Sequence, residues 1–312
     1  MLRRNFLLGT AVSVLRGAAL NSKERVGRAL QGRDVDRPPF SFWHHFGLKT
    51  AEDHARATLD FHRKYHTDIV KVMSDFPYPR PAGKWYELKV ESNPFPAQIR
   101  ALELIRSGLN GQTDFVETIF NPFNVAEKLS SPEEVRRLKD QKPQAMLDAL
   151  DVITQSEIRH ARRALETGAS GIFLAVANAN SAALSREDYV RFSAPFDRRI
   201  LEAVPGAHLN ILHLHTDRDQ LPVFRDFPAA VINYSLHVTG IPIAEVRRDF
   251  SMAIMGGLDE VNYRKLGKTE IQAQWKSAAA AAGSKFLLSP GCSVPNDSTP
   301  AELLRLPSAI GA

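Results

Sequence analysis

Two histidines and the only cysteine of the chain have the residue types and spacing of a metal site. His213 and His215 are two residues apart in an apolar run, and Cys292 ends a later run that begins at Lys285. Successive side chains of a strand alternate between faces, so the two imidazoles point the same way. Zinc takes nitrogen and sulfur ligands in tetrahedral geometry, and catalytic zinc keeps its fourth position open. Alternatively, His213 is a hydrogen-bonding residue of a metal-free site, and Cys292 is a small buried apolar residue.

Asp75 is the second candidate for chemistry and, with His213, is predicted to be catalytic. It closes the run Asp68–Asp75 and precedes Phe76 and Pro77. A carboxylate at the C-terminal end of a strand can face an active-site mouth, where partial burial raises its pKa. The alternative is that Asp75 caps the loop that follows, a position where aspartate is common.

Other polar side chains end apolar runs or follow them, and these are candidates for substrate binding. They are His44, His45, Asn121, Asn178 and Asn233, with Arg80 after the second run. Lys128 and Arg218 also follow apolar runs, and arginine in particular can bind a carboxylate through two parallel hydrogen bonds. No role is predicted for the histidines of helical stretches, His62, His66 and His160.

These residues require a fold that gathers the ends of distant runs in one place. Eight short runs rich in Val, Ile, Leu and Phe, bounded by Pro, Gly or charge, predict strands. Helical stretches separate most of them, so we expect an α/β protein, a single (β/α)8 TIM barrel with its active site at the strand ends. The runs are Pro38–Phe46, Asp68–Asp75, Asp114–Phe123, Gly171–Asn178, Leu209–Asp217, Ala229–Leu236, Met252–Asp259 and Lys285–Cys292.

Capping signals place several helices between the runs. Asn21–Gln31 predicts an N-terminal helical extension, and Thr50–Tyr65 and Ala145–Thr167 predict longer helices. Helix starts are predicted at Ser131, Ser185 and Thr299. No linker rich in Pro, Gly or Ser divides residues 21–312, which we interpret as one barrel domain.

Composition narrows the class of partner. The 312 residues carry a net charge of +5, but the basic residues are scattered, which favours a small anionic substrate over nucleic acid. No apolar run is long enough to span a membrane, and a single cysteine excludes an internal disulfide.

Residues 1–20 have the pattern of an export signal. Arg3 and Arg4 precede Phe6 and Leu7, and the apolar segment continues to Leu15, as in the twin-arginine motif. The alternatives are an N-terminal helix or an incorrectly assigned start codon. Export by the twin-arginine route is therefore the expectation for localisation, with the cytoplasm as the alternative.

Several segments, in this order, resemble the uroporphyrinogen decarboxylase superfamily. The resemblance extends over nearly everything after Asn21, and its most specific part is the segment Leu288–Pro295. The other segments are Glu24–Gly32 leading to Val35–Pro39, Ser74-Asp75, Phe120–Phe123, Leu212–His215 and Met255–Asp259.

The decarboxylase branch implies a (β/α)8 barrel that removes carbon dioxide from a tetrapyrrole without a cofactor. In that branch an aspartate at the position of Asp75 stabilises a protonated pyrrole, where positive charge develops in the transition state. Three features depart from that branch: His44-His45 replaces a pair of arginines, Lys128 stands near a tyrosine position, and Cys292 replaces a histidine. A carboxy-lyase acting on a tetrapyrrole or related anion is the first function that the resemblance implies, with a homodimer as the assembly.

A second branch contains zinc-dependent methyltransferases that move a methyl group from a corrinoid protein to a thiol. These enzymes resemble the chain in His213 and Cys292, while His215 stands where they have a cysteine. This branch implies zinc bound by His213, His215 and Cys292, and a corrinoid protein as partner. The third hypothesis is a barrel that binds a tetrapyrrole or small ligand without catalysis.

Overall fold

A computed structural model describes residues 19–312. The predicted twin-arginine motif, at Arg3-Arg4, lies outside the described residues. Among the helices of the described part, none is long and apolar enough to cross a membrane.

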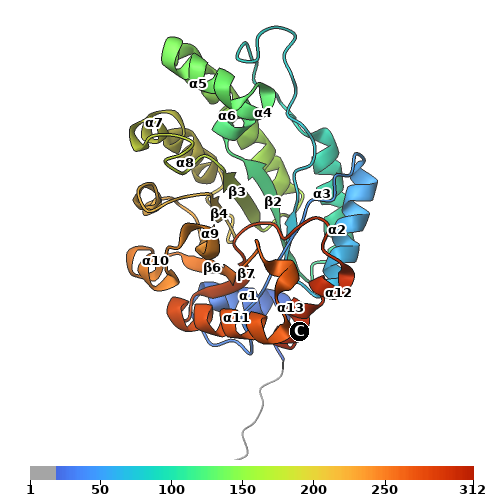
Figure 1. Cartoon of the computed structure of the whole chain (residues 1–312). Coiled ribbons are helices and arrows are strands. Elements are labelled where there is room, and N and C mark those ends of the chain that lie inside the picture. The colour runs from blue at the N-terminus through green and yellow to red at the C-terminus, as the bar shows by residue number, and fades with distance from the viewer. Residues whose placement is uncertain (1–18) are drawn as a thin grey trace, which may run out of the picture.

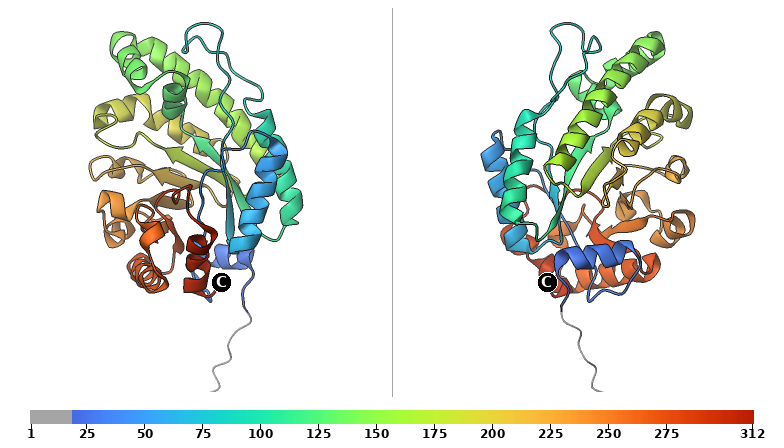
Figure 2. Two further views of the ribbon diagram at one scale, coloured as in Figure 1. Left: turned by 45° about the vertical axis from the view of Figure 1, so that its right-hand side comes forward. Right: turned by 180° about the vertical axis from the view of Figure 1, so that it is seen from behind.

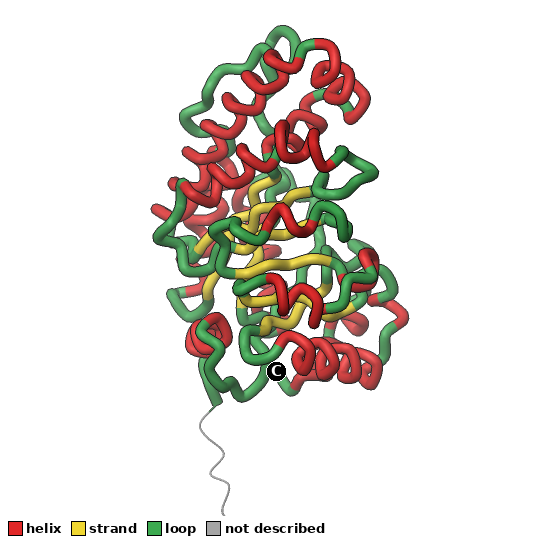
Figure 3. Tube along the Cα trace, turned by 90° about the vertical axis from the view of Figure 1, so that its left-hand side faces the viewer, coloured by secondary structure: helices red, strands yellow, loops and turns green. Residues whose placement is uncertain are grey.

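The centre of the protein is a curled, seven-stranded parallel sheet whose strands follow one another in chain order (Figures 1 and 3). Parallel strands require crossover connections, and helices supply most of them on the outside of the curl. The α/β barrel class predicted from the sequence is confirmed. The strands are β1 (Ile69–Val72), β2 (Asp114–Phe120), β3 (Gly171–Val176), β4 (Ile211–Leu214), β5 (Val231–Tyr234), β6 (Ala253–Leu258) and β7 (Phe286–Pro290).

The first predicted strand, Pro38–Phe46, is much shorter than expected: it forms a single parallel bridge, from Phe40 to Leu288 of β7. Leu288 N–H donates to the carbonyl of Pro39, and Ser41 N–H donates to the carbonyl of Leu288. On the other side, Asp68 N–H donates to the carbonyl of Phe40. The segment therefore lies between β7 and β1 and closes the ring, although proline, which has no N–H, prevents a longer ladder here.

The predicted helix starts are confirmed. The side chains of Asn21, Thr50, Ser131, Ser185 and Thr299 each accept a hydrogen bond from a backbone N–H three residues later. The helices are α1 (Ser22–Leu30), α2 (Ala51–Tyr65), α3 (Pro96–Leu109), α4 (Pro122–Leu129), α5 (Pro132–Gln141), α6 (Pro143–Glu166), α7 (Arg186–Phe192), α8 (Ala194–Glu202), α9 (Leu236–Thr239), α10 (Ile243–Asp249), α11 (Lys268–Ala282), α12 (Pro300–Leu303) and α13 (Arg305–Ile310), with 3-10 turns η1 (Leu221–Phe224) and η2 (Tyr263–Lys265).

Helix α1 packs beside β7 at the end of the barrel where the described chain begins, close to the C-terminus (Figure 2). Val26 of this helix is fully buried against apolar residues of the barrel interior, among them Ile69, Val116 and Leu287. The N-terminal helical extension thus covers one end of the barrel, and the opposite end, where the strands finish, stays available for a site.

The ring closure depends on Asp68, which is completely buried. One carboxylate oxygen lies 2.6 Å from Nη1 of Arg25, and the other lies 2.5 Å from Nη1 of Arg37. The carboxylate also accepts a hydrogen bond from the N–H of Phe40, at 3.0 Å. A buried charge is tolerated only when it is paired and hydrogen-bonded in this way.

Replacing Asp68 with asparagine should therefore destabilise the protein strongly. The substitution keeps the shape but removes the charge that pairs with both Arg25 and Arg37. Arg25 keeps its contacts with Asp36, whereas Arg37 loses the carboxylate that it binds, and breaking a buried pair costs about 3–5 kcal/mol. Asp60→Asn, on the exposed face of α2 where Asp60 pairs with Arg63, is the matched control and should change stability by less than about 1 kcal/mol. Urea denaturation measures both, and equal midpoints for the two variants would contradict this account.

Candidate functional site

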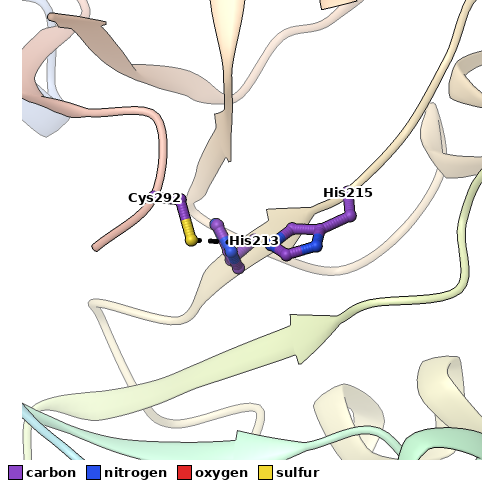
Figure 4. A group of neighbouring side chains, drawn as sticks. All are labelled: His213, His215 and Cys292. Carbon is purple, nitrogen blue, oxygen red and sulfur yellow. Dashed lines mark hydrogen bonds between the residues drawn. The ribbon is translucent and has the colours of Figure 1, made fainter. Parts of the chain in front are cut away.

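The structure brings His213, His215 and Cys292 together. His213 lies on β4, His215 follows it directly, and Cys292 comes two residues after β7. One potential ligand atom from each side chain lies within 4.8 Å of the other two (Figure 4). Sγ of Cys292 is 3.6 Å from Nε2 of His215. The predicted convergence of these three side chains at one rim of the barrel is therefore a feature of the structure.

Asn233 of β5 fixes the orientation of His213. The amide nitrogen of Asn233 donates to the carbonyls of Met255 and Pro290 and to the hydroxyl of Ser289. Its oxygen is therefore left to accept from Nδ1–H of His213, at 2.6 Å. When His213 is neutral, this arrangement leaves its Nε2 with the lone pair that a metal ion needs. Asn233, predicted as a substrate ligand, is fully buried and bound to His213, and its direct contact with a substrate stays a prediction.

The two imidazoles change the ionisation of the thiol. Burial acts to raise the pKa of Cys292, but hydrogen bonds and charge from His213 and His215 outweigh it and lower the pKa to about 4. The hydrogen bond with Cys292 in turn raises the pKa of His215. The thiolate is the form of cysteine that binds metal ions, so the cluster is electrostatically prepared for a cation.

Zinc fits this donor set. Two imidazole nitrogens and one thiolate are ligand types of catalytic zinc, and three protein ligands leave the fourth position for a substrate. The hydrogen bond from His213 to Asn233 is the kind of outer contact that metal-binding histidines make. A cavity of about 110 Å³ lies in front of the cluster and supplies space for that substrate.

We call this cavity the cluster cavity. Most of its lining residues are at alternate positions of the strands or directly after them. Much of the lining consists of pairs of residues spaced two apart in the sequence. These pairs are Lys71 and Met73, Thr118 and Phe120, Phe173 and Ala175, and His213 and His215. Side chains two apart on a strand share a face, so each of these pairs points into the barrel. Trp43, His45, Ala177, Cys292 and Ser293 complete the lining.

Lys71 is a residue of this cavity that the sequence reasoning missed. It is buried on β1, with its ammonium nitrogen 4.6 Å from the centroid of the Phe173 ring and 5.2 Å from that of Trp43. Burial lowers the pKa of Lys71 to about 7. The available signal was a lysine in the middle of the apolar run Ile69–Val72, because a charge at an inward strand position is unusual unless it has a function.

Asp75 lies next to the cluster cavity rather than in it. Its carboxylate is 3.4 Å from Nδ1 of His45 and 3.7 Å from Nδ1 of the buried His54, and it accepts a hydrogen bond from the N–H of Gly47. Burial acts to raise the pKa of Asp75, but the bond with His45 and the neighbouring His54 lower it below its usual value. His45 also lines the cluster cavity and so connects it to Asp75.

A second cavity, here called the Asp75 cavity, has a volume of about 190 Å³. It shares Thr118 and Phe120 with the cluster cavity, so the two adjoin. The long segment 73–95, which leaves β1 and runs beside α6 in Figure 1, forms one of its walls. Arg80 lines this cavity, but its guanidinium donates to the carbonyls of Lys128 and Leu129 at the end of α4.

The remaining predicted substrate ligands lie elsewhere. His44 packs against the rings of Phe46 and Phe61, and burial lowers its pKa. Asn121 and Asn178 are buried and hydrogen-bonded to each other at 2.7 Å. Both also donate to the hydroxyl of Ser193, at 3.0 Å, which anchors the loops after β2 and β3 to the start of α8. Direct substrate contact by these three residues stays a prediction.

A parallel barrel with polar groups gathered at the C-terminal ends of its strands defines the TIM-barrel class. Within this class, the family model for uroporphyrinogen decarboxylase (URO-D) matches residues 77–311, well over half of the chain. The chain therefore belongs to the URO-D family, as the sequence resemblance predicted. No curated protein matches it significantly.

Solved structures share the fold at low sequence identity. A methyltransferase from Methanosarcina mazei has a TM-score of 0.79 and 18% identity, with 93% of this chain and 98% of that one covered. A B12-independent methionine synthase from a Shewanella species, in complex with selenomethionine, has a TM-score of 0.61 and 12% identity over 88% and 92% of the chains. A putative vitamin-B12 independent methionine synthase from Listeria monocytogenes gives 0.54 and 10%, over 87% and 95%.

The role of Asn233 as the orienting partner of His213 can be tested by metal affinity. Asn233→Ala removes the acceptor of Nδ1–H, and loss of such an outer contact costs about 10- to 100-fold in metal affinity. Asn233→Asp is the comparison variant: it keeps an acceptor for that proton but loses the donor to the carbonyls of Met255 and Pro290, so it should be less stable than wild type yet bind zinc more tightly than the alanine variant does. Competition titration with a chromophoric zinc chelator gives both affinities, and a wild-type affinity in Asn233→Ala would refute the assignment.

Proposed function

We propose that this protein is a zinc-dependent methyltransferase whose methyl acceptor is a thiol. The observation that carries the proposal is the convergence of His213, His215 and Cys292 within 4.8 Å, with His213 oriented by Asn233. The names of its structural neighbours, a methyltransferase and two methionine synthases, support this choice within the URO-D family. The sequence resemblance to the corrinoid-dependent branch, carried by His213 and Cys292, makes a corrinoid on a partner protein the proposed methyl donor. The two methionine synthases are named as B12-independent, so their names do not support this choice of donor.

The chain's own residues supply the surroundings of the reacting sulfur. Zinc, when bound, stabilises the acceptor as a thiolate close to neutral pH. Trp43, Phe120 and Phe173 give the cluster cavity apolar walls, which exclude water from the thiolate. Two neutral histidines and one thiolate carry less negative charge than the set with two cysteines, so the bound sulfur is a weaker nucleophile. Exclusion of water by these apolar walls restores part of this nucleophilicity.

Lys71 lines the same cavity and is a basic group near the proposed metal site. With a pKa of about 7, it exists in both charge states near neutral pH, and its neutral amine can accept the proton that the acceptor thiol loses. The faces of Phe173 and Trp43 stabilise the resulting ammonium. Lys71 is thus the proposed proton acceptor of the site.

Decarboxylation remains the second candidate, because Asp75 lines a cavity beside the cluster. Its carboxylate, however, is already held by His45, and Arg80 is bound to backbone carbonyls instead of facing a substrate carboxylate. The cavity volume of about 190 Å³ is below the roughly 300–1,000 Å³ of pockets that enclose drug-sized ligands, and a tetrapyrrole is larger than these. Methyl transfer to a small thiol accords better with these dimensions.

Two variants separate the candidates by opposite effects. Under the methyl-transfer proposal, Cys292→Ser removes a zinc ligand and should lower the methylation of a thiol by at least about a hundredfold, whereas Asp75→Asn should change it by less than about tenfold. The assay incubates zinc-loaded protein with methylcobalamin and thiols and follows thioether formation by mass spectrometry.

Under the decarboxylase alternative, the same variants respond the other way. Asp75→Asn should abolish release of carbon dioxide from uroporphyrinogen, because the neutral amide no longer meets the positive charge that develops. Ser298→Ala, a change at a loop hydroxyl without a hydrogen-bond partner in the described part of the chain, is the control for both assays. Binding of a porphyrin or thiol without either product would support the third hypothesis, a ligand-binding barrel.

A further inference from the structure

The Asp75 cavity contains buried polar groups without partners, and the proposed metal centre does not use them. Glu157 of α6 is 1% exposed and lines the cavity, and its Oε2 atom has no hydrogen-bond partner among the described residues. The hydroxyl of Tyr78, also buried and in the lining, likewise has none within residues 19–312. Leaving such groups unpaired costs free energy, which a ligand that hydrogen-bonds to them would recover.

A cation stands at the edge of the same cavity. The ammonium nitrogen of Lys128, at the end of α4, lies 2.8 Å from the centroid of the Phe120 ring. Burial lowers its pKa to about 8, while Glu157, Asp75 and Glu127 act on it only through space. Arg80 holds the backbone of Lys128 in place through the carbonyl of that residue. Lys128 is thus a positioned positive charge available to an anionic group.

We propose that the Asp75 cavity binds the head group of an α-amino acid, with its ammonium at Glu157 and Tyr78 and its carboxylate at Lys128. A simple anion would meet the carboxyl groups of Asp75 and Glu157, and a simple cation would meet Lys128. Burial raises the pKa of Glu157 well above its usual value, so this carboxyl group takes up its negative charge only when an ammonium group binds beside it. A molecule with both charges therefore pairs with both sides of the cavity, and charge complementarity of this kind sets specificity.

The position of the cavity connects this head group to the metal centre. Thr118 and Phe120, neighbours on the inward face of β2, line both cavities. The side chain of a bound amino acid can therefore pass Phe120 toward Cys292. Taken with the proposed function, on which this step rests, the methyl acceptor is an amino-acid thiol. The head-group site itself does not depend on zinc.

Calorimetric titration of the full-length, zinc-loaded protein tests the inference with four probes. L-homocysteine carries both charges and a thiol, 4-mercaptobutyrate lacks the amine, 3-aminopropane-1-thiol lacks the carboxylate, and L-2-aminobutyrate lacks the sulfur. We expect each truncated thiol to bind at least about tenfold more weakly than L-homocysteine, the loss typical of one charge-assisted hydrogen bond. L-2-aminobutyrate should bind Cys292→Ser and wild type equally.

Variants assign the two ends of the ligand. Glu157→Gln should remove the preference for L-homocysteine over 4-mercaptobutyrate, and Lys128→Met should remove the preference over 3-aminopropane-1-thiol. Lys276→Met, which replaces an exposed lysine of α11, is the control and should keep both preferences. Equal affinities of the four probes in wild type, or unchanged preferences in both variants, would overturn the inference.

The outcomes also separate this inference from the proposed function. Binding of L-2-aminobutyrate without methyl transfer to any thiol would retain the head-group site and reject the methyltransferase. Methylation of 4-mercaptobutyrate at the same rate as L-homocysteine would retain the methyltransferase and reject the head-group site.

Discussion

The buried carboxylate of Asp68 holds the ring closed, and the arrangement of the rim depends on that closure. The segment around Phe40 contributes only one bridge to β7, so side-chain interactions supply what a full strand ladder would otherwise provide. Arg25, Arg37 and the N–H of Phe40 all bind this one carboxylate. With the ring closed, the segment that follows Phe40 places Trp43 and His45 against the cluster cavity, and β1 places Lys71 there. A surface bond could not hold these elements together as firmly, because water would compete for it.

Much of the fold could be predicted from the sequence because strand and helix signals are local. The apolar runs and the helix starts at Ser131, Ser185 and Thr299 indicated the elements, and the order of strands and helices indicated the barrel. The first strand was predicted too long, since the effect of Pro38 and Pro39 on its ladder depends on which neighbours the chain meets in space. That information is not local.

The candidate site shows the same division. The convergence of His213, His215 and Cys292 could be predicted, because strand periodicity and barrel closure together specify where strand ends meet. The role of Asn233 could not be predicted from the sequence. An asparagine that is buried behind a metal ligand and one that faces the substrate have the same sequence pattern. Lys71 was missed because only its contacts with Phe173 and Trp43 reveal how the structure accommodates a buried charge.

The central claim, that the cluster binds zinc and that the zinc binds the acceptor thiol, is tested most directly by X-ray absorption at the zinc edge. For the purified protein we predict one sulfur at about 2.3 Å and two nitrogens at about 2.0–2.1 Å, the normal distances for thiolate and imidazole. Addition of L-homocysteine should raise the sulfur count from one to two. A spectrum with no sulfur neighbour, or one that the thiol leaves unchanged, would contradict the account.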